Sequence, residues 1–237
     1  MTTTKNKLSI QGIGSASGGE FDKVHVNGKG TIDGDVDCQE FDLNGAGTVH
    51  GDIKSEAFRV NGSASIDGKV EVEDGRLDGA TKLQHELIFK SFEVNGSITV
   101  GGFVQGEKMN VKGRLKAGGN CEVDDFKLEG AFKINGLLSA DHVDAVLYGQ
   151  SNAREIGGQK IVVKRQRKVL SIFQAFFKTN LKVELIEGDD IELENTEADK
   201  VCGKNVVIGE NCNIGIVEYS GTISKHKNSV VQESKKV

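Results

Sequence analysis

Proline and tryptophan are absent from this chain of 237 residues, which also contains only two tyrosines and two methionines. Glycine, by contrast, occurs 31 times. Abundant glycine without proline excludes a collagen-like chain, and the even spread of apolar residues does not match a flexible linker. No run approaches the roughly 18 apolar residues that a membrane-spanning helix requires. A composition of this kind calls for a search for internal repeats.

The cysteines and the charges exclude further classes of protein. The four cysteines, at positions 38, 121, 202 and 212, lack the close spacing of zinc-finger or redox motifs. The 30 basic and 35 acidic residues give a formal net charge of −5, which disfavours a general nucleic-acid binder. The first ten residues, MTTTKNKLSI, are too polar for a signal peptide. We therefore expect a cytoplasmic protein with reduced thiols.

The glycines reveal a 17-residue repeat, because seven of them stand at positions 28, 45, 62, 79, 96, 113 and 130. Counted from each of these glycines, the offsets −4, −2, +2, +4, +8 and +10 are apolar at 36 of 42 sites. The alternate offsets are apolar at only six of 49 sites. Such alternation is typical of half-buried strands, and a constant period indicates a solenoid.

Three pairs of inward positions in each repeat predict an all-β fold, a triangular parallel β-helix with three short strands per turn. One corner is the repeated glycine itself, and the third corner carries charged residues at offsets +11 and +12. A second glycine column, at offset +6, predicts the remaining corner, where glycine accommodates a sharp bend. This column contains Gly34, Gly51, Gly68, Gly102, Gly119 and Gly136. The lack of proline fits a coil in which nearly every amide donates to the next turn.

Changes in regularity divide the chain into five predicted parts. Residues 1–20 form a lead with an irregular first turn, 21–147 the main β-helix, 148–180 a basic amphipathic connector, 181–222 a second, shorter β-helical part and 223–237 a disordered polar tail. In the connector, apolar residues at helical spacing predict a short amphipathic helix that interrupts the coil. These residues are Val169, Ile172, Phe173, Phe176 and Phe177.

The repeated Asn-Gly turns resemble those of the bactofilins, bacterial cytoskeletal proteins that polymerise without nucleotide. The turns that carry the resemblance are Asn27-Gly28, Asn44-Gly45, Asn61-Gly62 and Asn95-Gly96, and the match covers residues 21–147. Residues 191–219 look like the second coil of the longer bactofilin-like proteins of Gram-positive bacteria. The resemblance implies a right-handed coil, end-to-end assembly, and roles as a scaffold for envelope enzymes, cell shape and motility.

Two patterns suggest ligand binding, but each has a simpler explanation. The strings NGKGTIDG and NGAGTVHG resemble a glycine-rich phosphate loop, yet they recur every turn and open no predicted helix, so we expect no nucleotide binding. An aspartate cluster resembles the calcium sites of β-helix lyases, but a solvated acidic face is the simpler explanation. The cluster contains Asp33, Asp35, Asp37 and Asp52. No histidine pair has ligand-like spacing. We expect no catalytic residue, metal site or cofactor.

Two groups of residues are candidate interaction surfaces. Leu8 and Ile10, near an open end of the coil, together with the outward apolar residues Ile88, Phe103 and Leu137, are candidates for self-association or for packing of the amphipathic helix. The second group combines basic and aromatic residues, which is the composition of a membrane-surface or partner-binding helix. It contains Lys164, Arg165, Arg167, Lys168, Phe173, Phe176 and Phe177.

The sequence therefore favours a cytoplasmic scaffold that polymerises with itself and acts without nucleotide or nucleic acid. Association with a membrane surface or with envelope proteins is a further expectation. Three other classes remain open: a carbohydrate-active enzyme on a parallel β-helix, a hexapeptide acyltransferase, and a monomeric adaptor. The long loops that wall a catalytic cleft are missing from seven uninterrupted turns, which disfavours the first class. Only VVIGENCNIGIV suggests the second class.

Overall fold

The computed structural model describes residues 6–166 and 179–237, and these residues form strands and turns without a helix. The fold is a parallel β-helix, as predicted, and its residues group into two compact units. Unit 1 comprises residues 1–111 with Lys116–Gly118, and unit 2 comprises Lys112–Leu115 with Gly119–Val237. The predicted helix at residues 169–177 lies outside the described residues.

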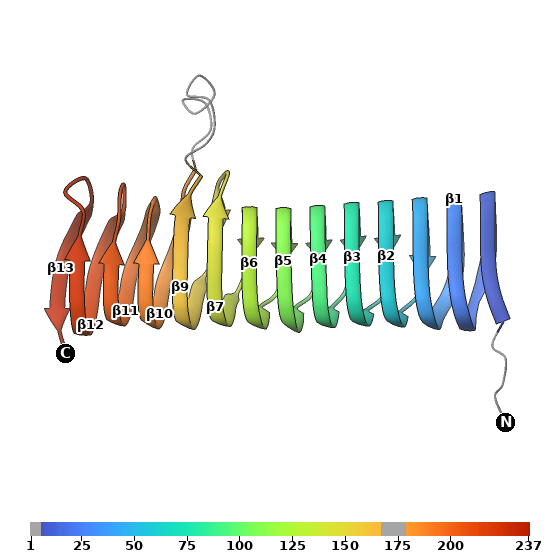
Figure 1. Cartoon of the computed structure of the whole chain (residues 1–237), viewed down its shortest axis with the longest axis horizontal. Helices are drawn as coiled ribbons and strands as arrows, with labels where there is room; N and C mark the ends of the chain where they lie inside the picture. Colours follow the sequence, from blue (N-terminus) through green and yellow to red (C-terminus); the bar gives the residue numbers. More distant parts are fainter. Residues whose placement is uncertain (1–5, 167–178) are drawn as a thin grey trace, which may run out of the picture. The chain divides into compact units, whose positions relative to one another are not determined.

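Each long strand of the fold spans most of one turn, and the first covers more than one. Unit 1 contains β1 (Asn6–His50), β2 (Ile53–Ile66), β3 (Val70–Leu83) and β4 (Leu87–Val100), and β5 (Val104–Ala117) is divided between the units. Unit 2 contains β6 (Cys121–Ile134), β7 (Leu137–Leu147), β8 (Ser151–Asn152), β9 (Glu155–Arg165), β10 (Leu181–Leu193), β11 (Thr196–Ile208), β12 (Asn213–Lys225) and β13 (Val230–Lys236). Figure 1 shows β2, β3 and β4 side by side.

Strand pairing in unit 1 keeps the period of the sequence. Val36 pairs with Ile53, Ile53 with Val70, and Val70 with Leu87. Each residue in this column is at most 2% exposed, whereas its neighbours along the strand face outward. The predicted inward positions are thus confirmed, because a constant period places chemically similar side chains above one another.

The corner glycines adopt a backbone conformation that other residues rarely reach. Gly62 has a φ of 131°, and a Cβ built on it would lie closer than 3.0 Å to the carbonyl oxygen of Gly45 in the preceding turn. Both facts require glycine at this corner. The chain also bends next to the second glycine column, between β1 and β2 at Gly51 and Asp52. At the third corner, two successive residues such as Glu73 and Asp74 are exposed.

The core of unit 1 contains a column of aromatic rings with one omission. The rings of Phe41 and Phe58 stack with centroids 5.3 Å apart. Gly75 follows Phe58 in the column, and a Cβ there would meet the ring of Phe92. Because Gly75 has no side chain, the Phe92 ring occupies its space and lies 6.3 Å from Phe58 and 5.5 Å from Phe89. A missing side chain in one turn is therefore filled from the next.

The first turn is shifted, as the sequence predicted. A Cβ on Gly45 would meet the carbonyl oxygen of Gly28, and a Cβ on Gly28 would meet that of Gly12. Gly12 therefore occupies the corner position of the first turn, and the spacing from Gly12 to Gly28 is one residue shorter than the regular period. Within this turn Ile10 is buried, Leu8 is half-buried and Ile13 is 87% exposed. The turn therefore continues the apolar column on its inner side and carries a large apolar side chain on its outer side.

Unit 2 has a less regular period, and this corrects the predicted connector at residues 148–180. The prediction is wrong in its first part, because Glu155–Arg165 is strand β9 and pairs with β7. Ile161 and Val163 are buried there, so residues 160–165 of the basic stretch contribute to a turn of the coil. The number of residues between paired positions in successive turns then changes from turn to turn. It is largest from β9 to β10, where the intervening sequence includes residues 167–178.

The predicted disordered tail at residues 223–237 is also wrong. Strand β12 extends to Lys225, and Val230–Lys236 forms β13, which pairs with β12 in parallel. The hydroxyl of Ser229 donates to the carbonyl oxygen of Gly209 at 2.5 Å and accepts the amide of Cys212 at 3.0 Å. These bonds hold the segment before β13 against the preceding turn, although its sequence is polar.

Candidate functional site

The outward side chains of unit 1 fall on three faces between the three corners. We compare them over the five turns whose corner glycines are Gly28 to Gly96. The mixed-charge face contains the outward residues five, three and one positions before each glycine. The neutral face contains those one, three and five positions after it, and the acidic face those seven, nine and eleven positions after it.

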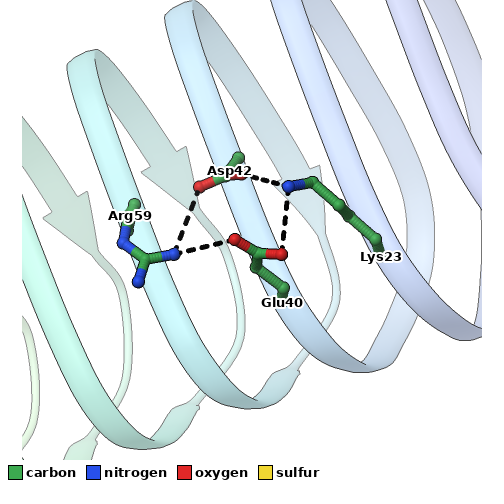
Figure 2. Close-up of polar contacts among 4 residues, drawn as sticks. All are labelled: Lys23, Glu40, Asp42 and Arg59. Carbon is green, nitrogen blue, oxygen red and sulfur yellow. Dashed lines mark hydrogen bonds and ion pairs between the residues drawn. The ribbon is translucent and has the colours of Figure 1, made fainter.

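The mixed-charge face carries a network of ion pairs between turns, part of which Figure 2 shows. The Lys23 ammonium lies 2.9 Å from a carboxylate oxygen of Asp42 and 3.0 Å from one of Glu40. From the other side, the Arg59 guanidinium donates to Glu40 at 2.8 Å. Hydrogen bonds to Asp42 and Glu40 raise the pKa of Lys23. The network joins three successive turns.

A second network on the same face begins one turn further on. The Arg76 guanidinium donates to Asp78 and Glu93, both at 2.8 Å, and Asn95 donates to Asp78 at 2.8 Å. Hydrogen bonds from Arg76 and Asn95 lower the pKa of Asp78. Arg59 and Arg76 are neighbours in register, but they pair in opposite directions along the coil. A shallow hollow of about 160 Å³ lies there, bounded by side chains with mutually neutralised charges.

The neutral face consists mainly of small residues and has as many acidic as basic side chains. Alanine, serine and threonine occupy most of its positions, with Asp33 and Asp67 balanced by Lys29 and Lys82. His50 lies at its edge, where Nδ1 is 2.6 Å from a carboxylate oxygen of Asp67. This hydrogen bond raises the pKa of His50. Because its acidic and basic residues balance, the neutral face has no excess charge that would attract a charged partner.

The acidic face has a strong excess of one charge. It carries eight carboxylates and three lysines. The carboxylates are Asp35, Asp37, Asp52, Glu56, Glu71, Glu73, Glu86 and Glu107, and the lysines are Lys54, Lys69 and Lys90. Two predicted surface residues, Phe103 and Ile88, lie on this face; Phe103 is 39% exposed and Ile88 half-buried. The third, Leu137, is half-buried in unit 2.

Two of the four aspartates in the predicted cluster accept hydrogen bonds from the backbone at a corner. Asp35 accepts the amide of Asp52, and Asp52 accepts the amide of Lys69, both at 2.8 Å. Asn120 does the same for Leu137 in unit 2, at 3.1 Å. These side chains satisfy amides where the chain bends. Within residues 6–166 and 179–237, no group of three histidine, cysteine or carboxylate side chains is arranged to hold a metal.

The predicted membrane or partner surface is described only in part. Lys164 and Arg165 lie in β9, and the Lys164 ammonium is 3.3 Å from a carboxylate oxygen of Glu192. The other five residues of this group lie outside the described residues: Arg167, Lys168, Phe173, Phe176 and Phe177. In the described part of the chain, no helix is long and apolar enough to cross a membrane.

The four cysteines have free thiols, and three of them are buried. Burial raises the pKa of Cys121 to about 12, which makes its thiol unreactive at neutral pH. Cys202 is half-buried on the outer surface, next to the ion pair between Lys200 and Glu218 at 2.9 Å. Desolvation raises its pKa as well. Neither cysteine has the activated thiol of a nucleophile.

Comparison with known proteins places the chain in a family. It is 56% identical over 232 residues to the uncharacterized protein YhbE of Bacillus subtilis (strain 168), and the match covers 98% of both chains. The chain belongs to the YhbE family. The uncharacterized protein YhbF of the same organism is 41% identical over 87 residues, which is 37% of this chain and 35% of YhbF. The YhbE match is nearly complete and therefore spans residues of both units of this chain. No family model and no solved structure matches.

Proposed function

We propose that the chain is a self-assembling scaffold that polymerises end to end without nucleotide and positions machinery of the cell envelope or of motility. The observation that carries the proposal is the uniform register of unit 1, in which every turn presents its neighbour with the same strand edges and apolar columns. A turn from a second copy can add to such an edge in the way that an internal turn does.

The first turn supports this proposal with its apolar residues. Leu8 and Ile10 continue the inward columns of Val24 and Val26, and Ile13 is 87% exposed beside them. Pairing with a second copy would remove this apolar surface from water, at roughly 25 cal/mol per Å². The resemblance of the Asn-Gly turns to those of bactofilins favours the same function.

Negative-stain electron microscopy of the purified protein, without nucleotide or metal and over a range of salt concentrations, tests the proposal. We expect filaments or sheets. Leu8→Asp should abolish them, because the carboxylate would lose hydration at the contact. Ile88→Asp is the matched control, because it places the same charge on an outward face away from the first turn.

The outcomes separate the possible contacts. Filaments that survive Leu8→Asp but not Ile88→Asp would move the contact to the acidic face and contradict end-to-end addition. Uniform short particles in the wild-type protein would exclude polymerisation and favour a monomeric adaptor. Circular dichroism of each variant verifies that the coil still forms.

Membrane association is a separate part of the proposal and depends on the basic and aromatic residues of the sequence. The composition of residues 164–178 favours an anionic membrane surface as their partner. In a liposome flotation assay, replacing Phe173, Phe176 and Phe177 with serine should reduce the recovery of protein with the vesicles. Unchanged recovery would rule out membrane binding through these side chains.

A further inference from the structure

The excess of negative charge in unit 1 is concentrated on one face. Over the same five turns, the mixed-charge face has five carboxylates and three basic side chains, and the neutral face has two of each. The acidic face has eight carboxylates and three lysines. Neighbouring carboxylates on a rigid sheet produce a local potential that attracts cations and repels anions. This face therefore selects among partners by charge.

Most of this charge is not neutralised within the chain. Lys69 pairs with Glu71 at 3.1 Å, and Lys90 pairs with Glu73 at 2.8 Å. Among the residues that the structure describes, Glu56, Glu86 and Glu107 form no direct ion pair, and Lys69 and Lys90 act on Glu86 and Glu107 only through weaker electrostatic interactions. On the mixed-charge face, by contrast, ion pairs engage every arginine of the five turns. The acidic face thus retains carboxylates that can bind a cationic partner.

An apolar spot lies within these carboxylates. Phe103 follows Glu86 in its column, and the carbonyl oxygen of Phe103 accepts the amide of Leu87 at 3.1 Å. Ile88, which follows Glu71 in the adjacent column, is the residue after Leu87. Phe103 and Ile88 are thus diagonal neighbours on one surface, at a spacing that a single side chain of a partner can span. Each of these two columns holds a polar or charged residue in its other four turns.

We propose that the acidic face of unit 1, with Phe103 and Ile88 at its apolar centre, is a docking surface for a cationic segment of a partner protein that carries apolar side chains. Lysine or arginine side chains of the partner would pair with Glu86 and Glu107, and an apolar side chain would cover Phe103. This proposal extends the scaffold function and rests on it, since a scaffold has to bind the machinery it positions. Docking does not require that the chain polymerises.

A binding titration with defined probes tests this proposal. The first probe is a fluorescent peptide of lysine, leucine and phenylalanine, and the second has serine in place of the leucine and phenylalanine. Fluorescence anisotropy should show that the full-length protein binds the first peptide about tenfold more tightly than the second. Higher salt should weaken binding of both peptides, because the carboxylates are exposed.

Matched variants locate the contact. Replacing Phe103 and Ile88 with serine should weaken binding of the apolar cationic peptide about tenfold, whereas Val207→Ser, which removes an exposed apolar side chain in unit 2, should leave it unchanged. Glu86→Gln should weaken binding more than Asp33→Asn, which removes an equal charge from the neutral face. Circular dichroism verifies that each variant is folded.

Three results would overturn the proposal: equal affinity for the two peptides, equal affinity of the wild-type protein and the Phe103 and Ile88 variant, or equal effects of Glu86→Gln and Asp33→Asn. A variant at Phe103 and Ile88 that binds the peptide normally but sediments as a smaller particle would assign this face to contact between copies. Because the titration measures peptide binding and not filaments, its failure is distinct from a failure of the proposed polymerisation.

Discussion

The glycine in the aromatic column of unit 1 allows a sharp test of how neighbouring turns pack. Gly75 has no positive φ, so alanine there meets a steric obstacle and no backbone strain. Its Cβ would lie closer than 3.0 Å to two carbons of the Phe92 ring. Ordinary carbon contacts are about 3.5–4.0 Å, so the ring has to move by about 1 Å. That movement disturbs its contacts with Phe58 and Phe89. We expect Gly75→Ala to lower the free energy of unfolding by about 1–3 kcal/mol.

The second half of this test is a double-mutant cycle with Phe92→Ala. Phe92→Ala alone should cost about 3–5 kcal/mol, because it leaves a cavity in the column. In that background the alanine at position 75 occupies part of the cavity, and its methyl group should be neutral or stabilise by up to ~0.8 kcal/mol. The coupling energy between the two positions is therefore about 2 kcal/mol. Urea unfolding followed by circular dichroism measures all four proteins. Additive effects, within about 0.5 kcal/mol, would refute the idea that Phe92 fills the space above Gly75.

Three further predictions concern a corner, a histidine pair and the thiols. Gly62→Ala should destabilise the coil by more than ~1 kcal/mol in urea unfolding, and no single core substitution should rescue it, because the obstacle is a backbone carbonyl and φ is positive. NMR titration of His50 should give a pKa above 6.5, and Asp67→Asn should lower that pKa. The stability that this pair contributes is fully present below the pKa of His50 in the unfolded chain and is lost as pH rises through its pKa in the folded protein. With iodoacetamide, mass spectrometry should detect alkylation of Cys202 before Cys121, whose labelling should require unfolding; equal rates would contradict the burial of Cys121.

The main coil was predictable because its period is constant. Once Gly45 and Gly62 are aligned, every inward position follows by counting, and residues such as Val60 are buried as expected. Counting does not show where a side chain of one turn fills the space left by a missing side chain in a neighbouring turn. Gly75 appears in the sequence as a defect in an aromatic column, and only the position of the Phe92 ring shows that the space is filled.

Unit 2 was harder to predict because its step changes from turn to turn and the step from β9 to β10 is much longer than the others. In β9, the inward residues Ile161 and Val163 stand between lysines and arginines, so the stretch appeared as a basic connector. In β13, polar residues on a strand with few apolar positions resembled a disordered tail. Local composition failed in both places because pairing with an adjacent turn determined the structure.

The candidate surfaces were likewise predictable from the sequence only in part. Phe103 and Ile88 were evident from the sequence as apolar residues at outward positions. Their place on the most acidic face was not, because that comparison requires all three corners to be known. Ile13 was missed because the shift of the first turn changes which positions face outward. The charged residues of Figure 2 come from different turns, far apart in the sequence, and only stacking of the turns brings them together.

The uniform register of unit 1 also has a consequence for how such a chain can change in length during evolution. Removing one whole repeat, for example residues 62–78, would join Asn61 directly to Gly79. Duplicating the same repeat would join Asp78 to a second copy of Gly62, so both changes keep a glycine at the corner. Every apolar column would stay in phase, since each turn contacts only its neighbours. A deletion of a single residue within a strand would instead reverse inside and outside from that point to the next corner. Gene duplication in whole repeats is thus a nearly neutral path, and unit 1 is a length of protein that selection can extend or shorten one turn at a time.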